Sequence, residues 1–159
     1  MKLIFTLCLV LFVCIANAQV TVNFGGGFSS AGKMVANIEA GYQFNKIKIN
    51  TGYLVSITDE CEVHDVFFLK AGHLINLTNK SSLDMGTGLA LHTYKREQVS
   101  KVDQRYSYFK TINAGKPLLY VNYQKLVISD GAFYIQALYT GGIMYAGAGL
   151  TYFFGQKNK

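Results

Sequence analysis

The sequence predicts an all-β fold: an eight-stranded antiparallel up-and-down transmembrane β-barrel behind a cleaved N-terminal signal peptide. The first observation is an alternation of apolar and polar side chains, with a period of two, that recurs in segments of about ten residues. The second is an apolar N-terminal run that is too short to span a membrane as a helix. The third is that many glycines fall on the polar faces of the predicted strands.

The first 18 residues have the pattern of an export signal. A short basic start, Met1-Lys2, precedes an apolar run at residues 3–15, and Ala16-Asn17-Ala18 is a small-x-small cleavage motif. We therefore expect residues 1–18 to be a signal peptide that is cleaved before Gln19. Residues 19–159 would then form a single barrel domain of the length of one ordinary domain.

Cleavage would change the charge and the cysteine content of the chain. The net charge would fall from +6 to +5, because Lys2 is the only charged side chain that is lost. Cys8 and Cys14 would leave with the signal, so that Cys61 would be the only cysteine and no intramolecular disulfide could form. The mature fold must therefore be stable without a disulfide.

The first two strands are expected at residues 19–28 and 34–44, with a glycine-containing turn between them. The second strand shows the clearest alternation, because one of its faces is entirely apolar. The residues of that face are Met34, Ala36, Ile38, Ala40, Tyr42 and Phe44. The opposite face carries Val35, Asn37, Glu39, Gly41 and Gln43, most of them polar, so the strand has two unlike sides.

The third and fourth strands are expected at residues 47–57 and 66–77. Asn45-Lys46 is short enough to reverse the chain into the third strand, in which Thr51 is the only polar residue on the apolar side. The fourth strand repeats the same pattern, and His73 is the exception on its apolar face. Both strands therefore have one side suited to an apolar environment.

The remaining strands are expected at residues 82–94, 117–125, 132–140 and 144–154. A polar stretch at residues 95–116 separates the fifth strand from the sixth and is interpreted as a long loop. The sixth strand begins with proline, a position at which a strand tolerates this residue. Together with the four strands above, these segments bring the predicted number of strands to eight.

The lengths of the connections predict how the barrel is oriented. With the N-terminus in the periplasm, the connections at 45–46, 78–81 and 126–131 lie on the periplasmic side, and all three are short. The connections at 58–65 and 95–116 lie outside and are longer. Short periplasmic turns and longer external loops are typical of outer-membrane barrels.

The glycines favour lipid outside the barrel over an apolar ligand inside it. An eight-stranded barrel has an interior only wide enough for side chains to fill, so small residues belong on the inner side. The glycines on the polar faces are Gly41, Gly52, Gly72, Gly86, Gly88, Gly147 and Gly149. The apolar faces would then meet hydrocarbon. The alternative is a soluble exported lipocalin-like barrel with an apolar ligand in its lumen.

Aromatic residues lie near both ends of the predicted strands, as in the two girdles of a membrane barrel. Those expected at the periplasmic ends are Tyr42, Phe44, Tyr152 and Phe154, and those expected at the external ends are Phe28, Phe67 and Tyr139. The final strand alternates Leu150, Tyr152 and Phe154. This chain resembles the small eight-stranded outer-membrane barrels of the OmpA/OmpX type and the outer-membrane β-barrel domain family.

The resemblance covers essentially all of residues 19–159 and implies a bacterial outer-membrane location. It also implies that Leu150, Tyr152 and Phe154 form the signal by which the barrel assembly machinery recognises the chain. The tail at residues 155–159 departs from the family pattern, because many members end at the terminal aromatic residue. Outer-membrane lipid is the partner that the resemblance implies for the apolar faces.

The inward faces are expected to carry a network of opposite charges that fills the lumen. Glu39 and Lys70 fall near mid-height, and Lys48 and Asp84 fall nearer the periplasmic rim. Buried charges are costly unless they are paired, so we expect these four side chains to interact. Because eight strands leave no aqueous channel, the network predicts packing and not transport.

The long external stretch is the candidate binding surface. Its basic and aromatic residues are Lys95, Arg96, Lys101, Arg105, Tyr106, Tyr108 and Lys110. They could bind an anionic polysaccharide, a lipid head group or a protein partner. Cys61 and His64 are weak candidate metal ligands, so no metal or cofactor is predicted. Nucleic acid is not an expected partner in this compartment.

The leading functional hypothesis is non-enzymatic: a small integral barrel whose external loops bind and whose wall adds structure to the membrane. The alternative enzyme would modify membrane lipid and would use His92, near the external rim. A nucleophile and a base are needed for that chemistry, and no serine or acid is placed beside His92 by its spacing in the sequence.

Overall fold

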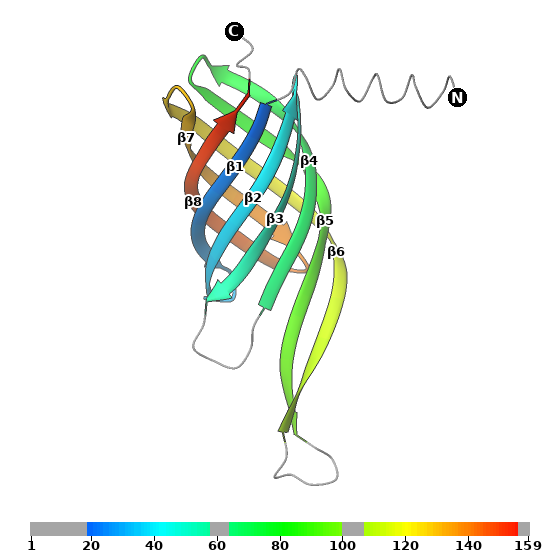
Figure 1. The fold of residues 1–159 in the computed structure, drawn as a ribbon. Helices are drawn as coiled ribbons and strands as arrows, with labels where there is room; N and C mark the ends of the chain where they lie inside the picture. The colour runs from blue at the N-terminus through cyan, green and yellow to red at the C-terminus, as the bar shows by residue number, and fades with distance from the viewer. Residues whose placement is uncertain (1–18, 58–63, 100–106, 156–159) are drawn as a thin grey trace, which may run out of the picture.

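The chain forms a closed antiparallel β-barrel of eight strands (Figure 1). The computed structural model describes residues 19–57, 64–99 and 107–155. Each strand pairs with its neighbours in chain order, and β1 closes the barrel by pairing with β8. The strands are β1 (Gln19–Ser29), β2 (Met34–Phe44), β3 (Ile47–Ile57), β4 (His64–Thr78), β5 (Ser81–Val99), β6 (Ser107–Ile128), β7 (Gly131–Thr140) and β8 (Ile143–Phe154).

The fold class and the number of strands are as predicted, and β2 and β3 have the predicted bounds. The largest difference between structure and prediction is at residues 95–116, for which the polar sequence predicts a loop. β5 continues to Val99 and β6 begins at Ser107, and the two stay paired from Thr93 with Asn113 to Val99 with Ser107. This hairpin extends beyond the other strands (Figure 1). A hairpin outside the barrel needs no apolar face, which explains why its polarity resembled that of a loop.

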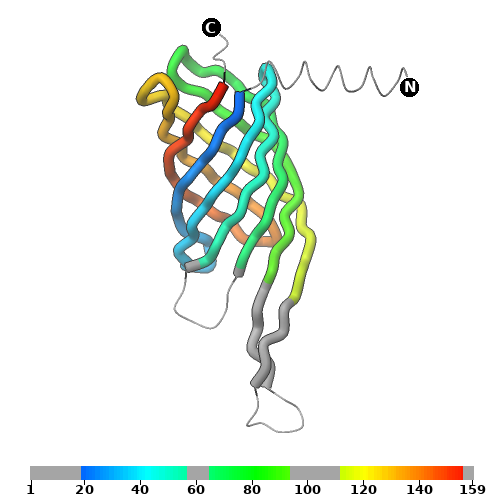
Figure 2. Tube along the Cα trace, viewed as in Figure 1, coloured from blue at the N-terminus to red at the C-terminus, as the bar shows by residue number. Residues whose placement is uncertain are grey.

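The two ends of the barrel differ in their connections. One end, here called the turn end, has the beginning of β1, the end of β8 and three two-residue turns (Figure 2). The opposite end, here called the loop end, includes the extended hairpin. The turn at residues 45–46 uses a left-handed backbone at Asn45, with φ of 54°, which asparagine tolerates better than most residues. Gly141 and Gly142 supply two successive positive φ angles in the β7–β8 turn at the loop end.

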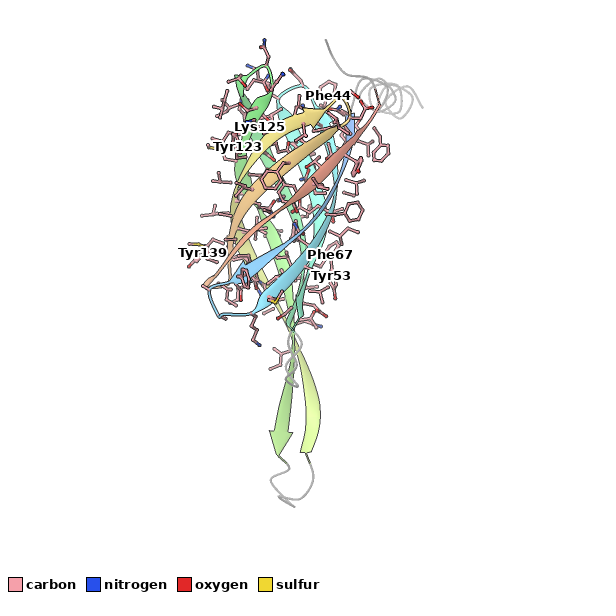
Figure 3. The ribbon with its side chains drawn as sticks, turned by 90° about the vertical axis from the view of Figure 1, so that its left-hand side faces the viewer. Phe44, Tyr53, Phe67, Tyr123, Lys125 and Tyr139 are labelled. Carbon is pink, nitrogen blue, oxygen red and sulfur yellow. The ribbon has the colours of Figure 1, made fainter. Side chains whose placement is uncertain are left out.

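The two faces of the barrel wall have opposite polarity. Large apolar side chains are exposed on the outer face, for example Phe24, Ile38 and Leu89. Six of the aromatic residues predicted at the strand ends are exposed on this face: Phe28, Phe44, Phe67, Tyr139, Tyr152 and Phe154. Figure 3 shows Phe44, Tyr123 and Lys125 towards the turn end, and Tyr53, Phe67 and Tyr139 towards the loop end. None of the described residues forms a helix that is long and apolar enough to cross a membrane.

Glycines lie on the inner side of the wall where neighbouring backbone leaves no room for a Cβ atom. At Gly149 on β8, an added Cβ would overlap the carbonyl group of Phe24 on β1. The obstruction is backbone, so a rotamer change cannot relieve it. The glycines therefore allow β1 and β8 to approach closely where they close the barrel.

Replacing Gly149 with alanine is expected to lower the free energy of unfolding by about 1–3 kcal/mol, because the new methyl group must push β1 and β8 apart. Urea unfolding of the folded barrel, followed by circular dichroism, measures the change. Gly115→Ala is the matched control, since no atom lies within 4 Å of a Cβ at Gly115. Equal losses in the two variants would contradict this account of the closure.

Candidate functional site

The candidate site is the filled interior of the barrel, where charged side chains meet at mid-height. Glu39 on β2 and Lys70 on β4 form an ion pair, with 2.9 Å between Lys70 Nζ and Glu39 Oε2. Both side chains are 0% exposed. The amide nitrogens of four side chains also donate hydrogen bonds to the Glu39 carboxylate, over 2.9 to 3.1 Å. These donors are Asn23, Asn37, Asn50 and Gln136.

Lys70 has further partners besides Glu39. Its Nζ donates to Gln136 Oε1 at 2.6 Å. It also lies 4.6 Å from the ring centroid of Tyr120 and 5.2 Å from that of Phe68, within the range of a cation–π contact. Gln136 therefore bonds to both members of the ion pair. The centre is a compact network in which both charges are surrounded by matching polar groups.

Lys48 and Asp84 lie on the turn-end side of this centre, and both are buried. The structure does not bring them into direct contact. Lys48 Nζ donates to Gln124 Oε1 at 3.4 Å, and Asp84 Oδ1 accepts a hydrogen bond from the Tyr120 hydroxyl at 2.9 Å. The four charges proposed from the sequence are therefore divided into one direct pair and two separately bonded groups.

The loop-end side of the lumen is closed by an apolar layer that the sequence analysis missed. Its buried residues are Val35, Leu54, Val66, Ala90, Leu118, Leu138 and Tyr145, and they belong to one cluster with Phe68 and Tyr120, whose rings contact Lys70 at mid-height. The available signal was the presence of consecutive apolar residues, such as Val66-Phe67-Phe68 and Leu118-Leu119, in which residues of both faces are apolar. The interior is thus polar and charged from the turn end to mid-height, and mainly apolar towards the loop end, where His92 and Thr140 are also buried.

His92 is also an inward, buried residue near the loop end. Its Nε2 lies 3.0 Å from the hydroxyl oxygen of Thr140, and both side chains are fully buried.

The residues predicted for the assembly signal are outward and exposed on β8; they are Leu150, Tyr152 and Phe154. The outer face of β8 is therefore apolar and aromatic, whereas the interior holds buried polar groups such as His92 and Thr140.

Several predicted residues lie outside what the structure describes. Lys101, Arg105, Tyr106 and Cys61 fall in undescribed segments, and only the backbone is described for His64, Lys95, Arg96, Tyr108 and Lys110. Within residues 19–57, 64–99 and 107–155, no three His, Cys, Asp or Glu side chains gather closely enough to hold a metal ion.

Solved structures with the same architecture include bacterial outer-membrane barrels. The N-terminal β-barrel domain of Pseudomonas aeruginosa OprF superposes with a TM-score of 0.70 at 12% identity, over 86% of this chain and 97% of that chain. Neisserial surface protein A gives 0.57 at 13% identity, over 86% and 96%. Ail of Yersinia pestis, in complex with the heparin analogue sucrose octasulfate, gives 0.59 at 10% identity, over 86% and 97%.

The chain matches no protein-family model and no curated protein. The structural likeness nevertheless confirms the fold: it is that of the small eight-stranded outer-membrane β-barrels, the class that the sequence resembles. The low identities mean that the likeness concerns the arrangement of the strands and not individual site residues.

Proposed function

We propose that the protein is a small integral outer-membrane β-barrel with a filled interior, which acts through its wall and its external segments. The observation that carries the proposal is the opposite polarity of the two faces: charges are buried inside, while Phe24, Ile38 and Leu89 are exposed outside. A water-soluble protein would not leave such a continuous apolar belt uncovered. A lipid bilayer is the environment in which this apolar belt is stable.

The packing of the lumen supports a structural role over transport. The Glu39–Lys70 centre occupies mid-height, and the apolar layer lies between it and the loop end. An apolar ligand inside the barrel, as in a soluble lipocalin-like protein, would have to displace this charged centre. Catalysis is not included in the proposal, because the His92–Thr140 pair is buried.

The proposed orientation places the loop end outside the cell and the turn end in the periplasm, after export by a signal peptide cleaved before Gln19. Assembly through Leu150, Tyr152 and Phe154 belongs to the same proposal, because these exposed residues alternate along the final strand. The β5–β6 hairpin would then extend from the cell surface. A polypeptide that reaches past the wall is well placed to meet partners in solution.

We propose an anionic polysaccharide as the external partner of this hairpin and its connecting segment. Residues 95–110 combine five basic residues with three aromatic ones, against two acidic residues at Glu97 and Asp103. The complex of Ail with a heparin analogue shows a polyanion on a barrel of this fold. Binding of sucrose octasulfate to the folded protein tests the proposal, with Lys95→Gln and Arg96→Gln expected to weaken it and Lys125→Gln, on the exposed surface near the opposite end, to leave it unchanged.

Fractionation and electrophoresis test the membrane assignment. We expect the mature protein in the outer-membrane pellet after a urea wash, and a folded band whose mobility changes on heating. In planar bilayers, the purified barrel should give no steady large conductance, because its interior is filled. Recovery of the mature protein in the wash without detergent would reject the lipid-facing assignment, and a steady large current would reject the filled lumen.

A further inference from the structure

A cavity of about 670 Å³ opens at the turn end of the barrel, a volume that suits a small organic ligand. Lys46 and Lys80 line it from two turns, and no aspartate or glutamate is among its lining residues. The other polar groups in the lining are the amides of Gln19, Gln43, Asn45, Asn76, Asn79 and Gln124 and the hydroxyls of Thr78, Ser81 and Ser82. The cavity therefore combines positive charge with neutral hydrogen-bonding groups.

A buried ammonium group, that of Lys48, lies behind Gln124, which separates it from the residues that line this turn-end cavity. Gln124, which lines the cavity, is 4% exposed and donates through Nε2 to Thr151 Oγ1 at 3.1 Å. Its Oε1 accepts from Lys48 Nζ at 3.4 Å, a long distance for a hydrogen bond. A lysine ammonium has three donors. Lys48 thus has donor capacity beyond this one bond, next to a side chain that faces the cavity.

The nearest carboxylate of the same layer does not neutralise Lys48 by direct contact. Asp84 Oδ1 and the Tyr120 hydroxyl both lie over Gly72, which is the register partner of Lys48 on β4. The hydroxyl donates to this carboxylate, and no ion pair joins Asp84 and Lys48 in the described part of the chain. An oxyanion that reached Lys48 would accept a charge-assisted hydrogen bond from its ammonium, in place of the long bond that Lys48 now donates to Gln124.

The rim of the cavity is held in place by backbone hydrogen bonds between turns and neighbouring strands. Lys46 O accepts from Leu74 N and Lys80 O accepts from Leu126 N, both at 2.7 Å. The third turn is fixed by a bond of 3.0 Å from Phe153 N to Asp130 O. The two turns that carry the rim lysines are therefore ordered before any ligand arrives, which reduces the entropy cost of binding.

We propose that the turn-end cavity binds a small hydroxylated oxyanion, with an acidic sugar as the fitting class, whose charged group contacts Lys48. Lys46 and Lys80 attract the anion to the mouth, and the amide and hydroxyl groups of the wall bond to its hydroxyls. Gln124 turns away from Lys48 as the acidic group enters. This site is additional to the proposed role of the external hairpin, and its binding does not depend on the orientation of the barrel in a membrane.

Titrations followed by amide NMR test the site in the full mature barrel, folded in an uncharged detergent. Glucuronate is expected to give saturable shifts at Ser82 and Gln124, and glucose is expected to give none. Glucose 6-phosphate forms a second arm that shows whether a phosphate replaces the carboxylate. Lys48→Met should weaken binding of the effective anion by at least about tenfold, since it removes a buried charged donor.

Two further variants keep the test decisive if Lys48→Met does not fold, as judged by its heat-modifiable band. Lys46 and Lys80 are exposed, so Lys46→Met/Lys80→Met should fold normally and still bind less tightly. Lys33→Met, at the loop end, is the matched control and should bind like the parent protein. Equal shifts with glucose, unchanged binding in the rim variant or in a folded Lys48→Met barrel, or no saturable shift with either anion would overturn the proposal.

Discussion

Replacing Glu39 with glutamine is expected to lower the free energy of unfolding by about 3–5 kcal/mol, the cost of breaking a buried ion pair by removing one partner. Glutamine has nearly the same size, but its NH₂ group would face donors that now converge on a carboxylate. The ammonium of Lys70, fully buried, would lose its countercharge. Urea unfolding in detergent, followed by circular dichroism, measures the loss, since the chain has no tryptophan to report by fluorescence.

A double-mutant cycle separates the pair from the rest of the network. Lys70→Met alone should also be strongly destabilising, because it leaves Glu39 as an uncompensated buried charge. The double variant Glu39→Gln/Lys70→Met should lose less than the sum of the two single losses, because it removes both charges together. Additive losses would show that the two side chains stabilise the barrel independently.

The fold was largely predictable because one physical requirement repeats along the chain. A strand between lipid and a filled polar lumen must alternate apolar and polar side chains, and two-residue turns determine where the alternation begins again in the next strand. β2 and β3 therefore have the predicted bounds, on either side of the turn at Asn45 and Lys46. The same reasoning failed for residues 95–116, where the strands leave the barrel and no buried face imposes a period of two.

The candidate site was less predictable, because alternation gives the direction of a side chain but not its partner. Glu39 on β2 and Lys70 on β4 lie on strands that are separated by β3. On β3, Gly52 is paired in register with Glu39 on one side and with Phe68 on the other. A Cβ at Gly52 would overlap the Phe68 ring and approach the Glu39 side chain within 2.8 Å. The ion pair therefore depends on Gly52, which the alternation places on the inner face without showing which side chains pack across it.

Replacing Ile38 with arginine is expected to lower the free energy of unfolding in a lipid bilayer by about 2–4 kcal/mol, the cost of a cation at the bilayer midplane. Ile38 is 49% exposed and lies in the middle of β2, in register with Phe24 and Tyr53. Unfolding of the barrel in phospholipid vesicles by urea measures the change.

Ile47→Arg is the matched control at the same wall. Ile47 is similarly exposed but pairs with Phe44 where the β2–β3 turn begins, so its arginine can reach the interface and should cost only about 0–1 kcal/mol. In a soluble barrel, neither arginine would be costly, because both would meet water. Ile38 and Glu39 are adjacent and point to opposite sides of one strand. Large losses in the free energy of unfolding from both Ile38→Arg in lipid and Glu39→Gln would therefore show that, at one depth of the wall, Ile38 faces lipid and Glu39 faces the lumen.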